Sequence, residues 1–208
     1  MNINDAYNRW SDNYDQMENR TRDLDFQAIQ DIVERLPFKT VVEIGCGTGK
    51  NTALLAKKAS TVIAMDFSEG MLAKARQKVP APNIEFVQAD IAKTWPVADD
   101  FADFITCNLV LEHIENLDFV FSEAQRTLRN NGRFFVSELH PFKQYIGGKA
   151  NFNNGEKDIV LTCFTHHISE FWQAALHNNL RCIELTERFI ADDKTDVPRL
   201  VNLLFLKK

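Results

Sequence analysis

Residues 41–51 read Val-Val-Glu-Ile-Gly-Cys-Gly-Thr-Gly-Lys-Asn, an apolar run that ends in three alternating glycines. This pattern predicts a strand, a tight turn and the first residues of a helix. Glycines let a ligand approach the bare backbone, and the N–H groups of a helix N-terminus point toward it. Asp66 ends the next apolar run, where a carboxylate can bind the hydroxyl groups of a ribose. The two features together predict a binding site for a ribose-containing ligand.

The spacing of the glycines limits which ligand this can be. A dinucleotide fingerprint needs glycines at its first, third and sixth positions, whereas Lys50 stands at the sixth position here and Gly49 comes one residue early. A phosphate-binding loop needs Ser or Thr after Gly-Lys, whereas Asn51 follows Lys50. The pattern therefore matches neither motif.

Strand-like and helix-like runs alternate through the chain, which predicts right-handed crossovers and a parallel sheet. Strands are expected at 40–44, 61–65, 84–88, 104–108, 133–138, 181–187 and 200–206. Helices are expected at 25–36, 51–59, 68–79, 117–128 and 167–178, with Ser68 as the N-cap of the third and a turn at 130–132 after the fourth. Residues 142–165 break the rhythm and predict a hairpin or an irregular insertion.

The composition is that of a globular chain of one domain. It has 208 residues, a net charge of −5 and an apolar content of 45%. Its basic residues are scattered, so we expect no nucleic acid as a partner. No apolar run suggests a signal peptide or a membrane span, and the four cysteines show no disulfide or metal spacing. We therefore expect a reduced, cytoplasmic protein, a monomer or homodimer, without a metal site.

Four ordered motifs over residues 40–140 carry a resemblance to a known family. The glycine turn is followed by Val-Ile-Ala-Met-Asp-Phe-Ser-Glu-Gly-Met-Leu at 62–72, Phe-Val-Gln-Ala-Asp-Ile at 86–91 and Phe-Ile-Thr-Cys-Asn-Leu-Val-Leu-Glu-His-Ile at 104–114. Leu-Arg-Asn-Asn-Gly-Arg-Phe-Phe at 128–135 is similar to that family's turn into its fifth strand. The chain thus resembles the small-molecule members of the class I S-adenosylmethionine-dependent methyltransferases.

The resemblance implies a fold and a division of the chain. The fold is a Rossmann-like three-layer α/β sandwich, whose seven-stranded, mainly parallel sheet has an antiparallel last strand. Within this single domain, residues 1–36 would form a helical lid segment and 37–140 the cofactor-binding core. Residues 141–165 would form a cap, and 166–208 would complete the sheet.

The resemblance also implies which residues bind the methionine half of S-adenosylmethionine. The backbone of Gly45, Cys46 and Gly47 would line it, and Gly49 would let the helix start close by. Glu43 would orient the amino group. Other expected contacts are the carboxylate partner Arg22, the aromatic Tyr14 of the leader segment, and Asn108 and Leu109 beneath the sulfonium.

The nucleoside half has its own set of implied contacts. Asp66 would accept both ribose hydroxyls, a charge-assisted bidentate contact. Phe67 and Met71 would flank the adenine. Asp90 would accept from the adenine amino group, and Ile91 would pack on the ring or donate its N–H to the ring nitrogen N1.

The expected activity is in-line methyl transfer to an oxygen or nitrogen of a small molecule, with S-adenosylhomocysteine as the second product. A general base helps where the acceptor arrives protonated. The order of preference for a base or substrate contact is His140, then His166, then His113. His113 and His140 are expected near the carboxyl ends of strands, which face the ligand crevice, and His166 opens the helix after the insertion. A structural or helix-capping role is the alternative for each histidine.

Aromatic residues outside the core suggest what covers the site. Trp10 and Tyr14 resemble the aromatic leader that folds over the cofactor in this family, with a docked surface helix as the alternative. Aromatic residues of the expected cap indicate a small, partly apolar substrate: Phe142, Tyr145, Phe152 and Phe164.

Other chemistries fit the sequence less well. Cys107 is expected to be a packed strand cysteine, because the Pro-Cys pair of cytosine-5 methyltransferases is absent. Asn108-Leu109-Val110-Leu111 lacks the Asn/Asp-Pro-Pro-Tyr/Phe motif of enzymes that methylate adenine or glutamine. A nicotinamide-dependent oxidoreductase and a non-catalytic cofactor-binding or partner subunit stay open as alternatives.

Overall fold

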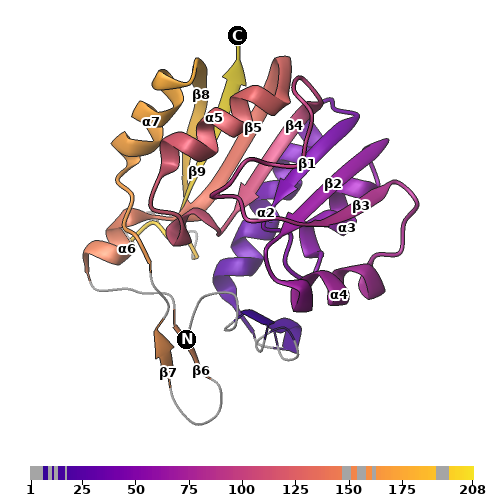
Figure 1. Ribbon diagram of the computed structural model, residues 1–208. Coiled ribbons are helices and arrows are strands. Elements are labelled where there is room, and N and C mark those ends of the chain that lie inside the picture. The colour runs from indigo at the N-terminus through magenta and orange to yellow at the C-terminus, as the bar shows by residue number, and fades with distance from the viewer. Residues whose placement is uncertain are drawn as a thin grey trace.

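A seven-stranded sheet in the order β3-β2-β1-β4-β5-β9-β8 forms the centre of the protein (Figure 1). The computed structural model describes residues 7–8, 11, 14–16, 18–146, 151–153, 158–160, 163–190 and 197–208. The strands of this sheet are β1 (Thr40–Ile44), β2 (Thr61–Asp66), β3 (Ile84–Gln88), β4 (Ala102–Asn108), β5 (Leu128–Leu139), β8 (Leu180–Arg188) and β9 (Leu200–Lys207). A separate two-stranded sheet consists of β6 (Asn151–Asn153) and β7 (Asp158–Val160).

The direction of the strands confirms the expected sheet. The pairs β1–β2, β2–β3, β1–β4 and β4–β5 are parallel. Strand β9, the last of the chain, is antiparallel to both β5 and β8 and lies between them. The parallel strands therefore end together at the lower edge in Figure 1, where the β6–β7 sheet also lies.

Helices cover both faces of the sheet, which gives three layers. The helical elements are η1 (Tyr14–Gln16), α2 (Arg20–Arg35), α3 (Lys50–Ala56), α4 (Glu69–Lys78), η2 (Leu111–His113), α5 (Leu117–Thr127), α6 (Pro141–Tyr145) and α7 (Ile168–His177). One core lies between the sheet and α5 and α7, and the other lies between the sheet and α2, α3 and α4. Because side chains alternate along a strand, Val42 and Ile44 of β1 enter the first core and Val41 enters the second.

Local capping explains where two helices begin. The Asn19 side chain accepts from the backbone N–H groups of Thr21 and Arg22, at 3.0 and 3.1 Å, so α2 starts at Arg20, five residues before the predicted start. The Ser68 hydroxyl accepts from Met71 N at 3.2 Å, which confirms the predicted N-cap of α4.

Strand β5 differs from its predicted bounds. It starts at Leu128, so the residues predicted as a turn, 130–132, lie within it. The pairing with β4 shifts register between Ala102 and Phe104, and Asn131 has a φ of 64°. The Asn-Asn-Gly sequence thus produces an irregularity inside the strand instead of ending the preceding helix.

The interrupted region after β5 contains α6 and the antiparallel β6–β7 pair, in agreement with the hairpin predicted for 142–165. Trp10 of the expected leader segment lies outside the described residues. In the described part of the chain, no helix is long and apolar enough to cross a membrane.

Candidate functional site

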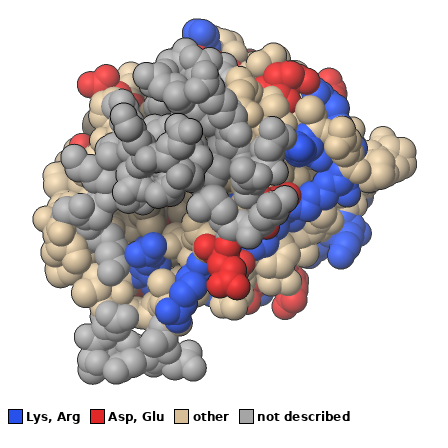
Figure 2. All heavy atoms as spheres, turned by 90° about the horizontal axis from the view of Figure 1, so that it is seen from below, with Lys and Arg blue, Asp and Glu red and all other residues tan. Residues whose placement is uncertain are grey.

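A cavity of about 1000 Å³ opens at the carboxyl ends of the parallel strands. Its walls come from the segments that follow β1, β2, β3 and β4, together with η1 and the start of α2. The order of strands reverses between β1 and β4, and such a reversal leaves a crevice at the carboxyl edge of an open α/β sheet. Figure 2 views this end of the molecule from below and shows acidic and basic side chains beside one another on it.

The glycine turn after β1 requires glycine for two separate reasons. Gly45, Gly47 and Gly49 have φ angles of 68°, 53° and 84°, in the left-handed region that glycine adopts most readily. A Cβ on Gly49 would lie 3.2 Å from Val79 Cγ2 and 3.3 Å from Ala75 Cβ, so this glycine also lets the turn pack closely on α4. A Cβ on Gly47 would meet no atom within 4 Å.

Asp66, at the end of β2, ties the glycine turn to the neighbouring strand. Its Oδ2 accepts from Gly47 N at 2.9 Å, and its Oδ1 accepts from Ser68 N at 2.9 Å. Burial raises the pKa of Asp66, and these backbone N–H groups lower it in part. The carboxylate lines the cavity, and each oxygen can still accept from a ligand hydroxyl.

The residues expected around an adenine form one wall of the cavity. Phe67, Met71, Asp90 and Ile91 all line it. Asp90 Oδ1 accepts from Ala92 N at 3.0 Å, which fixes the loop after β3. An aromatic ring, a thioether and an aliphatic side chain on this wall suit a flat heterocycle, and the carboxylate of Asp90 suits its amino group.

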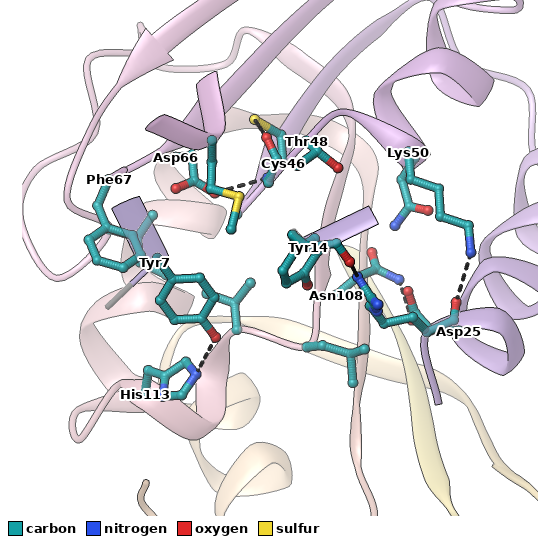
Figure 3. Close-up of a pocket in the computed structure, with 18 of the residues that line it drawn as sticks. Tyr7, Tyr14, Asp25, Cys46, Thr48, Lys50, Asp66, Phe67, Asn108 and His113 are labelled. Atoms are coloured by element: carbon teal, nitrogen blue, oxygen red, sulfur yellow. Dashed lines mark hydrogen bonds between the residues drawn. The ribbon is translucent and has the colours of Figure 1, made fainter. Parts of the chain in front are cut away.

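The end of β4 contributes an oriented amide and a strained backbone. The Thr106 hydroxyl donates to Asn108 Oδ1, so Asn108 Nδ2 points the other way and donates to Asp25 Oδ1 at 2.7 Å (Figure 3). Leu109 has a φ of 56°, which is unusual for a residue other than glycine, and Leu109 N donates to Ser137 O at 2.8 Å. Such strain is found most often at functional sites.

The N-terminal segment supplies the opposite wall. Tyr14 and Arg22 both line the cavity, as expected. The Arg22 guanidinium lies 4.2 Å from the centre of the Tyr14 ring, and its Nη1 donates to Tyr14 O at 2.8 Å. These contacts join η1 to the start of α2 and hold a cation at the cavity wall.

Glu43 and Gly49 are the two expected cofactor residues outside the cavity lining. The Glu43 side chain points to the side of α3, where Thr52 Oγ1 donates to its Oε2 at 2.6 Å. Only 3% of Glu43 is exposed, and burial raises its pKa to about 8, so the folded protein keeps this carboxyl protonated at pH 7. The structure thus gives Glu43 a contact beneath the glycine turn.

The structure places the three candidate histidines in different surroundings. Of the three, His113 alone lines the cavity, where Tyr7 Oη lies 2.9 Å from its Nε2 (Figure 3). The ring of His113 also lies 3.9 Å from Glu112 Oε1.

His140, the first choice, is turned away from the cavity. Its Nδ1 accepts from Phe142 N at 3.2 Å and so caps α6, and its Nε2 lies 3.0 Å from Glu187 Oε1 without hydrogen-bond geometry. His166, the second choice, has its Nε2 2.7 Å from Ile114 O and its ring edge-on to Phe171. Neither histidine is among the described residues that line the cavity, and a base or substrate contact for either stays a prediction.

Tyr7 and Asp25 are among the cavity residues that the sequence argument missed. Tyr7 lies edge-on to Phe67, with ring centres 5.7 Å apart, and reaches His113 across 106 positions of the chain. Asp25 is 5% exposed and lies on the apolar side of α2 with Ile29 and Ile32. A carboxylate on the buried face of a helix was the available signal for Asp25, whereas no local pattern marks Tyr7.

The expected cap aromatics lie outside the cavity lining where the structure describes them. Phe142 and Tyr145 of α6 are 41% and 55% exposed, and the Tyr145 hydroxyl is hydrogen-bonded to His167 Nδ1. Phe164 N donates to Glu112 O at 2.7 Å, so the segment after β7 runs along η2. The side chain of Phe152 lies outside the described part.

The cavity offers carboxylates, backbone N–H groups and an arginine, but no evident metal centre. Among the described residues, no group of three His, Cys, Asp or Glu side chains is placed to hold a metal ion. The arrangement suits an organic ligand that carries hydroxyl groups, a flat ring and charges of both signs.

Comparison with known proteins adds independent information. A family model described as a methyltransferase domain matches residues 42–136. The chain is 34% identical over 128 residues to the biotin biosynthesis bifunctional protein BioHC of Cellvibrio japonicus, covering 62% of this chain and 25% of that one. It is 35% identical over 111 residues to trans-aconitate 2-methyltransferase of Azoarcus sp., covering 51% and 42%.

Solved structures share the fold. A putative S-adenosylmethionine-dependent methyltransferase from Listeria monocytogenes superposes with a TM-score of 0.74 at 20% identity, covering 89% of this chain and 99% of that one. The curated relatives are matched over less of their length, since the chain spans a quarter of the first and about two fifths of the second.

Proposed function

We propose that the chain is a class I S-adenosylmethionine-dependent methyltransferase that methylates a small-molecule acceptor at oxygen or nitrogen. The observation that carries this proposal is the hydrogen bond from Gly47 N to Asp66 Oδ2, 2.9 Å long, at the mouth of the cavity. It joins the glycine turn to Asp66, the acidic residue at the end of the next strand. The carboxylate that would bind the ribose therefore lies beside the backbone that would bind the rest of the cofactor.

The nucleoside half of the cofactor fits the wall beyond Asp66. Asp66 accepts the ribose hydroxyls, Phe67 and Met71 enclose the adenine, and Asp90 accepts from its amino group. Ile91 covers the ring or donates its backbone N–H to N1. All of these residues line the cavity, and the space in front of Gly47 is open.

The methionine half fits the wall between the glycine turn and α2. Gly45, Cys46 and Gly47 face it with backbone, and Arg22 pairs with the carboxylate. Asn108 and Leu109 lie at the end of β4, beneath the sulfonium. The Leu109 backbone is held there by the hydrogen bond from its N–H to Ser137 O.

S-adenosylmethionine supplies an activated methyl group together with its own leaving group. The protein's residues then have to align the acceptor and exclude water. Tyr7 and Tyr14 help to exclude water, because both come from the N-terminal segment and line the cavity. This agrees with a lid role for residues 1–36.

The acceptor lies at the end of the cavity formed by Tyr7, Val110, His113 and Ile114. His113, whose Nε2 lies 2.9 Å from Tyr7 Oη, is the base or acceptor contact there. Burial raises the pKa of Tyr7, so the phenol stays protonated at neutral pH. A cavity of about 1000 Å³ leaves room for a small acceptor beside the cofactor, and one relative is named for a small organic acid.

A binding assay and a transfer assay test the proposal together. S-adenosylhomocysteine should raise the melting temperature of the protein, and NADH should not. Labelled methyl groups from S-adenosylmethionine should then appear in one member of a metabolite panel. Stabilisation by NADH instead would favour an oxidoreductase, and cofactor binding without transfer to any acceptor would favour a non-catalytic subunit.

A further inference from the structure

Helix α2 presents two opposite charges to the cavity one helical turn apart. Arg22 and Asp25 are three residues apart, a spacing that puts both on the same side of a helix, and both line the cavity. An amino-acid group carries a carboxylate and an ammonium separated by one carbon atom. A cation and an anion on one helix face are complementary to such a zwitterion.

We propose that Asp25 binds the ammonium group of the cofactor's amino-acid end, and that Arg22 and Asp25 together recognise this zwitterion. The inference rests on the proposed function, because it takes S-adenosylmethionine as the ligand. It assigns to Asp25 the contact that the sequence argument assigned to Glu43.

The position of the Asp25 carboxylate is fixed from the side of β4. Asn108 Nδ2 donates to Asp25 Oδ1 at 2.7 Å, and the Thr106 hydroxyl holds the Asn108 amide in this orientation. The carboxylate therefore lies beside the end of β4, opposite the glycine turn (Figure 3). This is where the amino-acid end of a ligand would lie if its ribose were bound by Asp66.

The burial of Asp25 favours a cationic ligand. Only 5% of the residue is exposed, and a buried carboxylate is costly without a counter-charge. Burial raises the pKa of Asp25, and hydrogen bonds from neutral side chains offset this in part. The charge of Lys50 lowers the pKa of Asp25 in part, but its ammonium forms its ion pair with Asp23, 3.0 Å from Oδ1. A ligand ammonium would give Asp25 a direct counter-charge.

Glu43 does not meet these requirements. Its carboxyl accepts from Thr52 at 2.6 Å beneath the turn, and it is absent from the described lining of the cavity. A carboxyl that bonds to Thr52 behind the turn is a poor partner for an ammonium group in the cavity.

The test compares two ligands that differ in the amino-acid end. S-adenosylhomocysteine carries it, and 5′-methylthioadenosine has the same nucleoside and sulfur without it. We expect Asp25→Asn to lower the affinity for S-adenosylhomocysteine at least tenfold and the affinity for methylthioadenosine less than twofold. Both affinities are measured by calorimetry on the full chain. Asp31→Asn is the control: it makes the same change on the same helix, at an ion pair with Arg188 away from the cavity. It should leave the affinity for both ligands unchanged.

An equal loss of affinity for both ligands in Asp25→Asn, or no loss for either, would overturn the role of Asp25. A wild-type protein that binds neither ligand would overturn the proposed function itself. If Asp25→Asn fails to fold, the wild-type protein can be titrated with the deaminated analogue of S-adenosylhomocysteine. We expect that analogue to bind at least tenfold more weakly than S-adenosylhomocysteine, and equal binding would overturn the ammonium contact.

Discussion

The side chain of Val110 fills the space that a Cβ on Gly45 would need. The built Cβ would lie 2.2 Å from Val110 Cγ2, closer than real Cβ atoms approach. Gly45 follows β1 and Val110 follows β4, the two strands between which the sheet order reverses. The first glycine of the turn is therefore required by packing between the two halves of the sheet as well as by its φ of 68°.

This relationship predicts different costs for two glycine substitutions. Gly47→Ala should reduce the free energy of unfolding by about 1–2 kcal/mol, because it places a side chain at a positive φ without a clash. Gly45→Ala should cost more, because it adds the clash with Val110. Adding Val110→Ala to Gly45→Ala should recover part of the loss. Urea denaturation measures all three variants, and equal costs for the two glycines would contradict the packing argument.

Glu138 should make the stability of the protein depend on pH. Its Oε1 accepts from Val110 N and Leu111 N, both at 2.7 Å, and burial raises its pKa to about 8. Between the ordinary glutamate pKa, 4.5, and this value, the folded chain holds a proton that the unfolded chain has lost. Stability therefore falls as the pH rises through this window, by up to about 1.4 kcal/mol per pH unit.

Glu138→Gln tests this dependence, because glutamine keeps the acceptor oxygen and does not titrate. We expect the melting temperature of the variant to fall less steeply between pH 5 and pH 8 than that of the wild-type protein. Glu115→Gln, at an exposed position, should leave the slope unchanged. Parallel curves for Glu138→Gln and the wild-type protein would show that Glu138 is ionised in the folded state.

Tyr7 should support cofactor binding through its ring. Tyr7→Ala removes the edge-on contact with Phe67, so we expect S-adenosylhomocysteine to bind about two- to tenfold more weakly. Tyr7→Phe keeps this contact and removes only the hydroxyl that meets His113, so its affinity should stay within twofold of wild type. Calorimetry separates the two variants, and an equal loss in both would assign the effect to the hydroxyl.

His113 and His140 should behave differently once an acceptor is known. His113→Asn should lower kcat by a factor on the order of 10², the usual range for a lost general base, with the affinity for S-adenosylhomocysteine unchanged. His140→Ala should cost about 1 kcal/mol of stability, because it removes the cap of α6, and should leave kcat unchanged. A labelled-methyl assay and thermal denaturation measure the two effects, and a loss of kcat in His140→Ala alone would reverse the assignment.

The sequence was sufficient to predict the sheet and to place Asp66 beside the glycine turn, because both depend on local patterns. β-branched runs mark β1 and β2, and Asp66 stands where β2 ends. The direction of individual side chains was less predictable. His140 does follow β5, but its ring turns to cap α6, and Glu43 faces α3 because residues alternate along β1.

Residues brought in by tertiary contacts were harder still to find. Tyr7 reaches His113 and Asp25 reaches Asn108 only because the N-terminal segment and α2 fold against the carboxyl edge of the sheet. Neither Tyr7 nor Asp25 is part of a motif with fixed spacing to the glycine turn. Sequence separation of this size, 83 positions between Asp25 and Asn108, leaves no local pattern to interpret.

Calorimetric titration of S-adenosylhomocysteine into the wild-type protein and into Asp66→Ala tests the central claim most directly. We predict one site per chain in the wild-type protein, no binding of NADH, and at least a tenfold loss of S-adenosylhomocysteine affinity in Asp66→Ala. Binding of NADH in place of S-adenosylhomocysteine, or unchanged affinity in Asp66→Ala, would contradict the account of this cavity as a methyl-donor site.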